Sequence, residues 1–335
     1  MTKLYRQQGS ALSFAKRLGL GAVILGASVF GFSTTASADN VTVATTTQGS
    51  LNHIVGSSIA RVLSEEMDVR ARVQPHTGES ALLPLVHSGQ AELGLAAINQ
   101  AMGIYYGADN GRPQENLRIL TTLFPVKVGY FVREDSDIHT MEDLRGKRVT
   151  HGYMAQGAMI DVVNALLANG GLTPDDVRTV SVPNVNRGGD DFASGRADAF
   201  FHAVGAGKVS EVDASVGGLR LIPLDTSDEA MSRVLETFPQ GYRFDQPPAD
   251  GLAGFSEETP VLAYDYVLVV GAGVSDDLVY DMTRTLAENK PKLVQGARVL
   301  QDMSLERMYI DWEIPTHPGA VRYYEEQGLS PAAPK

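Results

Sequence analysis

The 335-residue sequence has no cysteine and only one tryptophan. Without cysteine the chain can form neither disulfides nor zinc–thiolate sites, and it has no thiol nucleophile and no cysteine for an N-terminal lipid anchor. Long hydrophobic runs are also missing. No stretch after residue 38 approaches the roughly 18 apolar residues that a membrane-spanning helix needs. We therefore expect residues 39–335 to form a soluble protein.

Positive charge is scarce and unevenly placed. The sequence carries 28 lysine and arginine residues against 40 acidic ones. Four of these basic residues and none of the acidic ones precede residue 39, so the remaining 297 residues carry a net charge of −16. A chain this acidic offers no basic face to nucleic acid, and the sequence excludes that class of partner.

Signatures of catalysis are absent as well. The seven histidines show no HExxH or other metal-ligand spacing, and no Gly-x-Ser-x-Gly elbow occurs. The motifs at Gly205-Ala-Gly207 and Gly271-Ala-Gly273 lack the third glycine of a dinucleotide fingerprint. The sequence thus predicts a protein that is not an enzyme and that has no cofactor and no metal. The alternative is an exported enzyme in which His53 or His202 acts as an acid–base group.

The first 38 residues have the composition of a secretory signal peptide. A basic leader with Lys3 and Arg17 precedes the uncharged apolar run 18–32, and the small residues Ala36-Ser37-Ala38 follow. We expect cleavage near Ala38. An exported chain without cysteine is typical of a bacterial periplasm, which is the predicted location.

The stretch 41–63 predicts a strand, a polar turn and a helix. Apolar residues alternate over 41–44 and then recur at helical spacing over 54–63. Ligands of α/β proteins bind where a strand ends and the positive end of a helix begins. The predicted ligand-binding residues of this turn offer hydroxyl and amide groups: Thr46, Thr47, Gln48, Ser50 and Asn52. The alternative is an ordinary connection in which Ser50 is the N-cap.

The same order of elements continues along the chain. Alternation over 69–73, a short helix containing Leu82 and a buried strand over 92–97 give a β-α-β-α-β order, which favours a parallel sheet flanked by helices. Asn99 and Gln100 follow the last of these strands. We predict that they face the same crevice as the first turn; the alternative is that they are solvated loop amides.

A second polar turn precedes the amphipathic helix at 159–167. The unpaired N–H groups at the start of that helix can bind an anion without a basic side chain. The candidates in this turn are Tyr153, Gln156, Gly157 and Ala158. After the next buried strand, His202 and Gly205 occupy the place that corresponds to Asn99 and Gln100, and we predict that they too contact the ligand.

Two long extended segments suggest crossings between two lobes. Residues 117–132, interrupted by Phe124-Pro125, would lead from lobe 1 to lobe 2, and residues 261–270 would return. We assign 39–124 plus 275–335 to lobe 1 and 125–274 to lobe 2, to within about ten residues. Lys127 is the one cation predicted to bind the ligand; alternatively it reaches solvent from an edge strand. Residues 237–260 are expected to form an irregular loop or lid.

At this point the chain resembles the TAXI-type solute receptors of TRAP transporters, which are two-lobed periplasmic binding proteins. The resemblance spans nearly all of residues 39–335, and three segments carry it: Leu144-Arg145-Gly146-Lys147-Arg148-Val149, Ser88-Gly89-Gln90-Ala91-Glu92-Leu93-Gly94 and the tail 317–329. It implies a type II-like fold, in which each lobe is a mostly parallel sheet flanked by helices and the ligand cleft lies between the lobes.

The resemblance also implies a function. We expect a monomeric receptor that captures a small anionic or zwitterionic solute by lobe closure and delivers it to TRAP membrane permease subunits. Dicarboxylates, oxo-acids and amino acids are the implied solutes. Two departures from the family occur: bulkier side chains at 45–52 replace a run of glycine and threonine, and 247–252 lacks a threonine-tyrosine pair. The alternative function is a ligand-sensing receptor for a membrane sensor.

Overall fold

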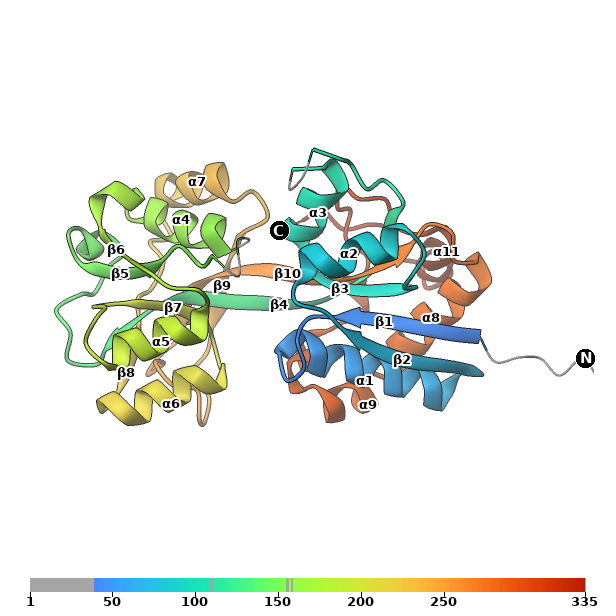
Figure 1. Ribbon diagram of the computed structural model, residues 1–335, viewed down its shortest axis with the longest axis horizontal. Coiled ribbons are helices and arrows are strands. Elements are labelled where there is room, and N and C mark those ends of the chain that lie inside the picture. Colours follow the sequence, from blue (N-terminus) through green and yellow to red (C-terminus); the bar gives the residue numbers. More distant parts are fainter. Residues whose placement is uncertain (1–38, 109–110, 155–156, 158, 335) are drawn as a thin grey trace, which may run out of the picture. The chain divides into compact units, whose positions relative to one another are not determined.

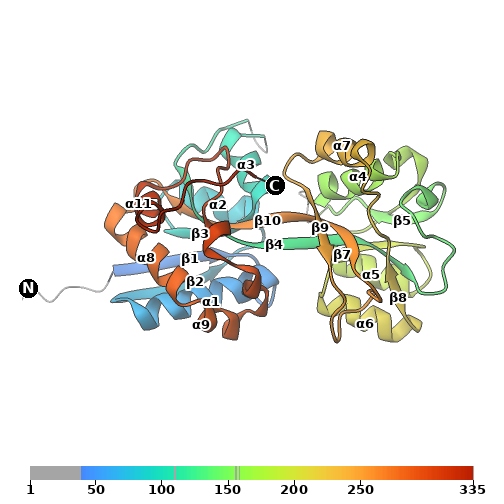
Figure 2. The same ribbon diagram turned by 180° about the vertical axis from the view of Figure 1, so that it is seen from behind.

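The computed structural model describes residues 39–108, 111–154, 157 and 159–334 (Figures 1 and 2). The predicted signal peptide and the candidates Gln156 and Ala158 lie outside these residues. The strands are β1 (Asp39–Thr45), β2 (Val69–Pro75), β3 (Leu93–Ala97), β4 (Leu117–Arg133), β5 (Arg148–His151), β6 (Arg178–Ser181), β7 (Phe200–Ala203), β8 (Leu219–Leu221), β9 (Tyr242–Gln246) and β10 (Thr259–Gly271).

Helices connect these strands and follow the last one. The α-helices are α1 (Leu51–Glu66), α2 (Glu79–His87), α3 (Ile98–Tyr106), α4 (Met159–Asn169), α5 (Val185–Ala193), α6 (Gly207–Val216), α7 (Asp228–Thr237), α8 (Asp276–Glu288), α9 (Lys290–Gly296), α10 (Leu305–Met308) and α11 (Pro318–Glu326). The described residues also contain three short 3₁₀ helices, η1 (Glu142–Leu144), η2 (Pro174–Asp176) and η3 (Arg298–Asp302). In the described residues no helix is long and apolar enough to cross a membrane.

The described strands form an eight-stranded sheet and a two-stranded sheet. The order β2-β1-β3-β10-β4-β7 makes up most of the large sheet, with β9 paired to β10 and β8 paired to β4. β1 is parallel to both of its neighbours, and β5 is parallel to β6. The expected parallel pairing therefore holds within these groups, whereas β4 and β10 are antiparallel to every strand that they pair with.

The two long strands β4 and β10 run side by side through the described chain (Figures 1 and 2). One end of β10, at 266–270, pairs with β3, and the other end, at 259–263, pairs with β9. Pro125 lies inside β4 opposite Asp265, so the proline does not divide the segment into two strands as the sequence suggests. The register is continuous across Pro125, from Tyr264↔Val126 to Tyr266↔Phe124, and it shifts only beyond Tyr266.

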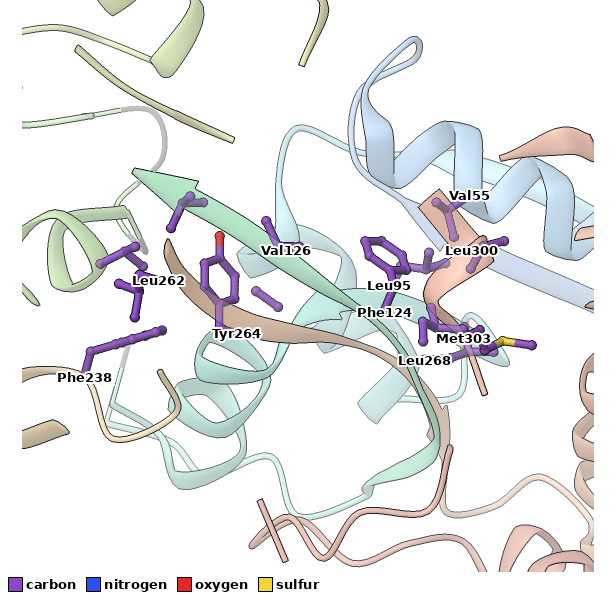
Figure 3. Packing of buried hydrophobic residues seen from close by; sticks show 14 of the residues in the cluster. Val55, Leu95, Phe124, Val126, Phe238, Leu262, Tyr264, Leu268, Leu300 and Met303 are labelled. Atoms are coloured by element: carbon purple, nitrogen blue, oxygen red, sulfur yellow. The ribbon is translucent and has the colours of Figure 1, made fainter. Parts of the chain in front are cut away.

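One hydrophobic cluster extends along both long strands. In Figure 3, Leu95, Phe124 and Leu300 lie along one stretch of β4 and β10, and Phe238 and Leu262 lie along another. All five side chains are buried. Because the same cluster contains residues from both ends of the chain, burial of apolar surface links the C-terminal segment to the first strands.

The α/β fold expected from the sequence is confirmed. Ser50 is the N-cap of α1, as in the alternative reading of that turn, Ser275 is the N-cap of α8, and Thr173 and Asp176 form a capping box. One prediction is wrong in detail. Residues 237–260 are not wholly irregular, because strand β9 lies within them and gains its partners from β10.

Candidate functional site

The carboxyl ends of β1, β2 and β3 meet at one edge of the large sheet, because these three strands are parallel. The polar turn 46–50 follows β1, His76 follows β2, and the first turn of α3 follows β3. This edge, with the residues that border it, is the candidate site. It is the place where ligands bind in parallel α/β sheets.

Hydrogen bonds hold the turn after β1 in a defined shape. The Thr46 hydroxyl lies 2.8 Å from the Ser50 hydroxyl, and the Ser50 Oγ accepts a bond from the His53 N–H at 3.1 Å. The Thr45 hydroxyl is 3.1 Å from Nδ1 of His53. The hydroxyls of Thr46 and Ser50 thus have partners within the turn, whereas Thr47 and Gln48 are exposed.

Asn52 fixes this turn to the neighbouring strand. Its side-chain Oδ1 accepts a bond from the Thr46 N–H at 3.0 Å, and its Nδ2 donates to the Leu95 carbonyl oxygen at 2.9 Å. Asn52 is only 4% exposed. Helix α1 approaches closely here because Gly56 has no side chain; a Cβ at this position would clash with the Thr45 methyl group. Asn52 therefore positions the turn.

Glu79, the first residue of α2, places a carboxyl group at the same edge. Tyr266 of β10 donates its hydroxyl to Oε1, and the Ala97 N–H donates to Oε2 at 3.2 Å. Burial raises the pKa of this carboxyl to about 7, and hydrogen bonds from Tyr266, Ala97 and Asn52 offset only part of that effect. Close to neutral pH the group can therefore change its charge.

Tyr266 is held in place from two sides. Its ring stacks on Phe124 with the centroids 5.5 Å apart, and its backbone pairs with β3 at Ala97. Burial raises its pKa well above the ordinary value, and the nearby charge of Glu79 adds to the shift. Tyr266 therefore remains a neutral hydrogen-bond donor throughout the physiological range.

Two buried polar atoms at this edge have no hydrogen-bond partner in the described part of the chain. They are Oδ1 of Asn99, in the first turn of α3, and Nε2 of His76. Next to them, Nε2 of Gln100 donates to the Ser80 hydroxyl at 3.4 Å. Asn99 and Gln100 thus lie in a helix, and Asn99 presents an acceptor that a bound molecule could satisfy.

The candidates from the second half of the chain are more enclosed. His202 is 5% exposed; its Nδ1 accepts the Ala203 N–H at 2.9 Å, and its Nε2 lies 3.1 Å from Oδ1 of Asn186. These partners require the proton on Nε2, and burial lowers the pKa of the ring to about 4. His202 is therefore neutral at physiological pH.

Tyr153 is fully buried, and its hydroxyl lies 2.8 Å from that of Thr150. Its φ of 23° is unusual for a residue other than glycine. Gly205 adopts a φ of 75° in the turn after β7. The Gly157 carbonyl accepts the Ile160 N–H at 3.0 Å, which places Gly157 next to the start of α4.

Lys127 of β4 is paired with an acid. Its Nζ lies 2.6 Å from Oδ2 of Asp302 and 4.6 Å from the centroid of the Phe244 ring. Its backbone carbonyl accepts the Val204 N–H, so it adjoins the end of β7. Lys127 therefore does not simply extend into solvent from an edge strand.

A cavity of about 680 Å³ lies away from all of these residues. Asp39 and Asn40 at the start of β1, Glu92 before β3 and residues 271–275 after β10 contribute to its lining. This is the amino end of the parallel strands, opposite the polar edge. In the residues that the structure describes, no cluster of three or more histidine, aspartate or glutamate side chains could hold a metal ion.

A family model described as NMT1-like matches residues 43–328. The chain belongs to the NMT1-like family. PhnD1 from Prochlorococcus marinus (MIT 9301), solved in complex with methylphosphonate, is 11% identical to this NMT1-like protein; the alignment covers 87% of this chain and 97% of that chain, with a TM-score of 0.54. A TctC solute binding protein from Polaromonas, solved without ligand, is 14% identical over 82% of this chain and 90% of that chain, with a TM-score of 0.53.

At these identities the likeness establishes the fold alone, which for this NMT1-like protein is that of a periplasmic solute-binding protein. The sequence reasoning missed Glu79 and Tyr266. The first of these had a usable signal, because Glu79 directly follows residues 76–78, which link β2 to α2 just as 46–50 links β1 to α1. Tyr266 had none, since it belongs to a strand some 190 residues away that only the sheet order brings to this edge.

Proposed function

We propose that this NMT1-like protein is a periplasmic receptor of the TAXI type, which captures a small organic acid and delivers it to a TRAP-type membrane permease. The observation that carries the proposal is the polar edge of the parallel strands. There Asn52 holds the turn 46–50 against β3, and the acceptor on Asn99 has no partner among the described residues. A small polar molecule would complete these interactions.

The proposed capture mechanism is closure of two lobes about β4 and β10. We place the hinge near Pro125 and Asp265, which lie opposite each other on the two strands. On one side of this point β10 pairs with β3; on the other side β10 pairs with β9 and β4 pairs with β7. The turn after β1 and the start of α4 would then contact opposite sides of the solute. Closure requires that the solute bind the closed state more tightly than the open one.

The chemistry of the proposed solute follows from the groups at hand. Hydroxyls, amides and backbone N–H groups at helix starts bind carboxylates and other small anions. PhnD1, of the same fold, was solved with methylphosphonate, which is an anion of this size. Dicarboxylates, oxo-acids and amino acids are the classes that we propose for this receptor.

A thermal-shift screen of the secreted protein tests the proposal. The panel contains monocarboxylates, dicarboxylates, oxo-acids and amino acids. A solute present at about 100 times its dissociation constant stabilises the folded state by roughly 2.7 kcal/mol, so its midpoint rises measurably. The proposal fails if no member of the panel raises the midpoint.

Variants test which residues bind. We expect Thr47→Ala combined with Gln156→Ala to weaken the affinity for a solute found in the screen while leaving the unfolding midpoint of the free protein unchanged. Unchanged affinity would refute the assignment of these two turns. Uptake measured with and without the permease separates a transport receptor from a sensing receptor, because only transport is lost with the permease.

A further inference from the structure

The side chain of Glu79 places a carboxyl group at a site that we propose binds organic acids. It lies at the start of α2, beside the N-terminus of α3, and its two oxygens accept bonds from Tyr266 and from the Ala97 N–H. Glu79 is only partly exposed. Because each oxygen already accepts a bond from the protein, the arrangement suits an ionised carboxylate with further lone pairs available to a ligand.

No described lysine, arginine or histidine is among the groups that shift the pKa of Glu79. The groups that do so are Tyr266, Ala97 and Asn52, all of them uncharged donors, and burial outweighs their effect. Among the residues that the structure describes, no cation therefore neutralises the negative charge of Glu79. A cation on a bound molecule would reduce the free-energy cost of keeping this buried carboxylate ionised.

A second acceptor belongs to the neighbouring helix. Helices α2 and α3 begin side by side, because the Ala97 N–H donates to Glu79 and the Gln100 amide donates to Ser80. Asn99 is in the same first turn of α3, and its Oδ1 has no partner in the described residues. The start of α3 thus offers an acceptor that a donor of a bound molecule could satisfy.

We propose that Glu79 is a specificity-determining residue that accepts hydrogen bonds from a protonated amine of the solute. This inference rests on the proposed function and narrows it. The receptor prefers acids that carry an ammonium group over acids with the same carbon skeleton and no amine. A second carboxylate placed beside Glu79 meets a like charge in a poorly solvated position and is rejected.

The proposal fixes the sign of the pH dependence. An ammonium group stabilises ionised Glu79, so affinity rises as the pH increases from about 6 to 8, and binding releases protons. A solute carboxylate at the same place has the opposite effect. Other titratable groups border this edge: Tyr264 and Tyr266 on β10, His53 on α1 and His76 after β2. Variants His53→Gln and His76→Gln separate their contribution from that of Glu79.

Matched pairs of probes test the inference by titration calorimetry. L-glutamate is compared with glutarate, L-aspartate with succinate, and L-alanine with propionate. For the secreted wild-type protein we expect the amine-bearing member of the pair that binds to be preferred by about 10- to 100-fold, the effect of one hydrogen bond to a charged group. Glu79→Gln removes most of this preference.

Glu92→Gln is the control variant. Glu92 is also partly buried and accepts one backbone bond, from the Thr42 N–H at 2.6 Å, but it lies at the opposite ends of β1 and β3. We expect it to leave the preference unchanged. If Glu79→Gln does not fold, calorimetry of the wild-type protein in buffers of different ionisation heat tests the inference instead. Release of protons on binding of an amine-bearing probe would support the role of Glu79.

The outcomes distinguish this inference from the proposed function. A preference that survives in Glu79→Gln, or proton uptake when an amine-bearing probe binds, overturns the role of Glu79 and leaves a receptor for organic acids standing. If neither member of any pair binds the wild-type protein, the proposed function fails and this inference fails with it.

Discussion

Lys127 and Asp302 form an ion pair with Nζ and Oδ2 2.6 Å apart, and only 16% and 27% of their side chains are exposed. Lys127 belongs to β4 and Asp302 to η3, so the pair ties a strand in the middle of the chain to the C-terminal segment. The ammonium also lies over the Phe244 ring. A role of Lys127 in solute binding, which the sequence predicted and which remains a prediction, would require Asp302 to share its partner.

The strength of this pair can be measured with a double-mutant cycle. We predict that Lys127→Met and Asp302→Asn each lower the free energy of unfolding and that their coupling energy is about 1 kcal/mol, at the upper end for partly exposed pairs. Urea denaturation of the four proteins gives the value. Strictly additive effects would mean that the pair contributes nothing.

Another ion pair, between Arg307 and Asp265, involves strand β10, which pairs with β4, and its carboxylate is more deeply buried. Asp265 is 1% exposed, and its Oδ1 accepts bonds from Arg307 at 2.7 Å and from the Tyr242 hydroxyl at 3.1 Å. We predict that Arg307→Met destabilises the protein by about 3–5 kcal/mol, because it leaves a buried carboxylate without its cation.

Arg322→Met is the control for this variant. Arg322 pairs with Asp277 at 3.0 Å, but their side chains are 44% and 89% exposed. Solvent screening limits such a pair to less than about 1 kcal/mol. Urea denaturation measures the free energy of unfolding of both variants. Equal decreases in the two would contradict the prediction that the burial of Asp265 makes its pair with Arg307 more important for stability.

The raised pKa of Glu79 predicts a pH-dependent cost in the absence of solute. Between pH 4.5 and about 7 the folded state binds a proton that the unfolded state has lost, so this group's contribution to stability falls as the pH rises through that window. We predict that, when the pH is raised from 5 to 8, the free energy of unfolding of Glu79→Gln increases by about 2 kcal/mol relative to that of the wild type. Denaturation curves at the two pH values measure this gain, and Glu92→Gln should give none.

The lowered pKa of His202 leads to the opposite prediction, that stability decreases as the pH falls. Its pKa in the folded state is about 4, below the 6.5 of an unfolded chain, so stability is lost as the pH falls from 6.5 towards 4. This group alone should cost about 2 kcal/mol at pH 5 relative to pH 7. In His202→Gln the loss between these two pH values should shrink by that amount, whereas replacing the exposed His139 should not change it.

Nitrogen-15 NMR of the imidazole rings tests the state of His202 directly. We predict a neutral ring with the proton on Nε2 at pH 6, because Nδ1 accepts the Ala203 N–H. An imidazolium signal from His202 at that pH would show that the ring is solvated and would remove the basis for the predicted loss.

Local signals in the sequence determined most of the secondary structure. The alternation over 41–44, the helical spacing over 54–63 and the possible N-cap at Ser50 act over a few residues, so the sequence alone predicts them. The same local reasoning located the polar turn after β1 and the amides after β3. It did not predict β9, because that short strand has its hydrogen-bond partners on β10.

Pairings between distant segments were decided only by the tertiary structure. The sequence gives Lys127 as an unexpected cation in an apolar strand, but Asp302, 175 residues later, becomes its partner only when η3 packs near β4. Glu79 likewise reads as a routine acid at the start of a helix. Its raised pKa arises because folding buries it beside Tyr266 of β10. Charge, hydroxyl and amide groups are properties of the residues, whereas burial and partners depend on the packing of segments that lie far apart in the chain.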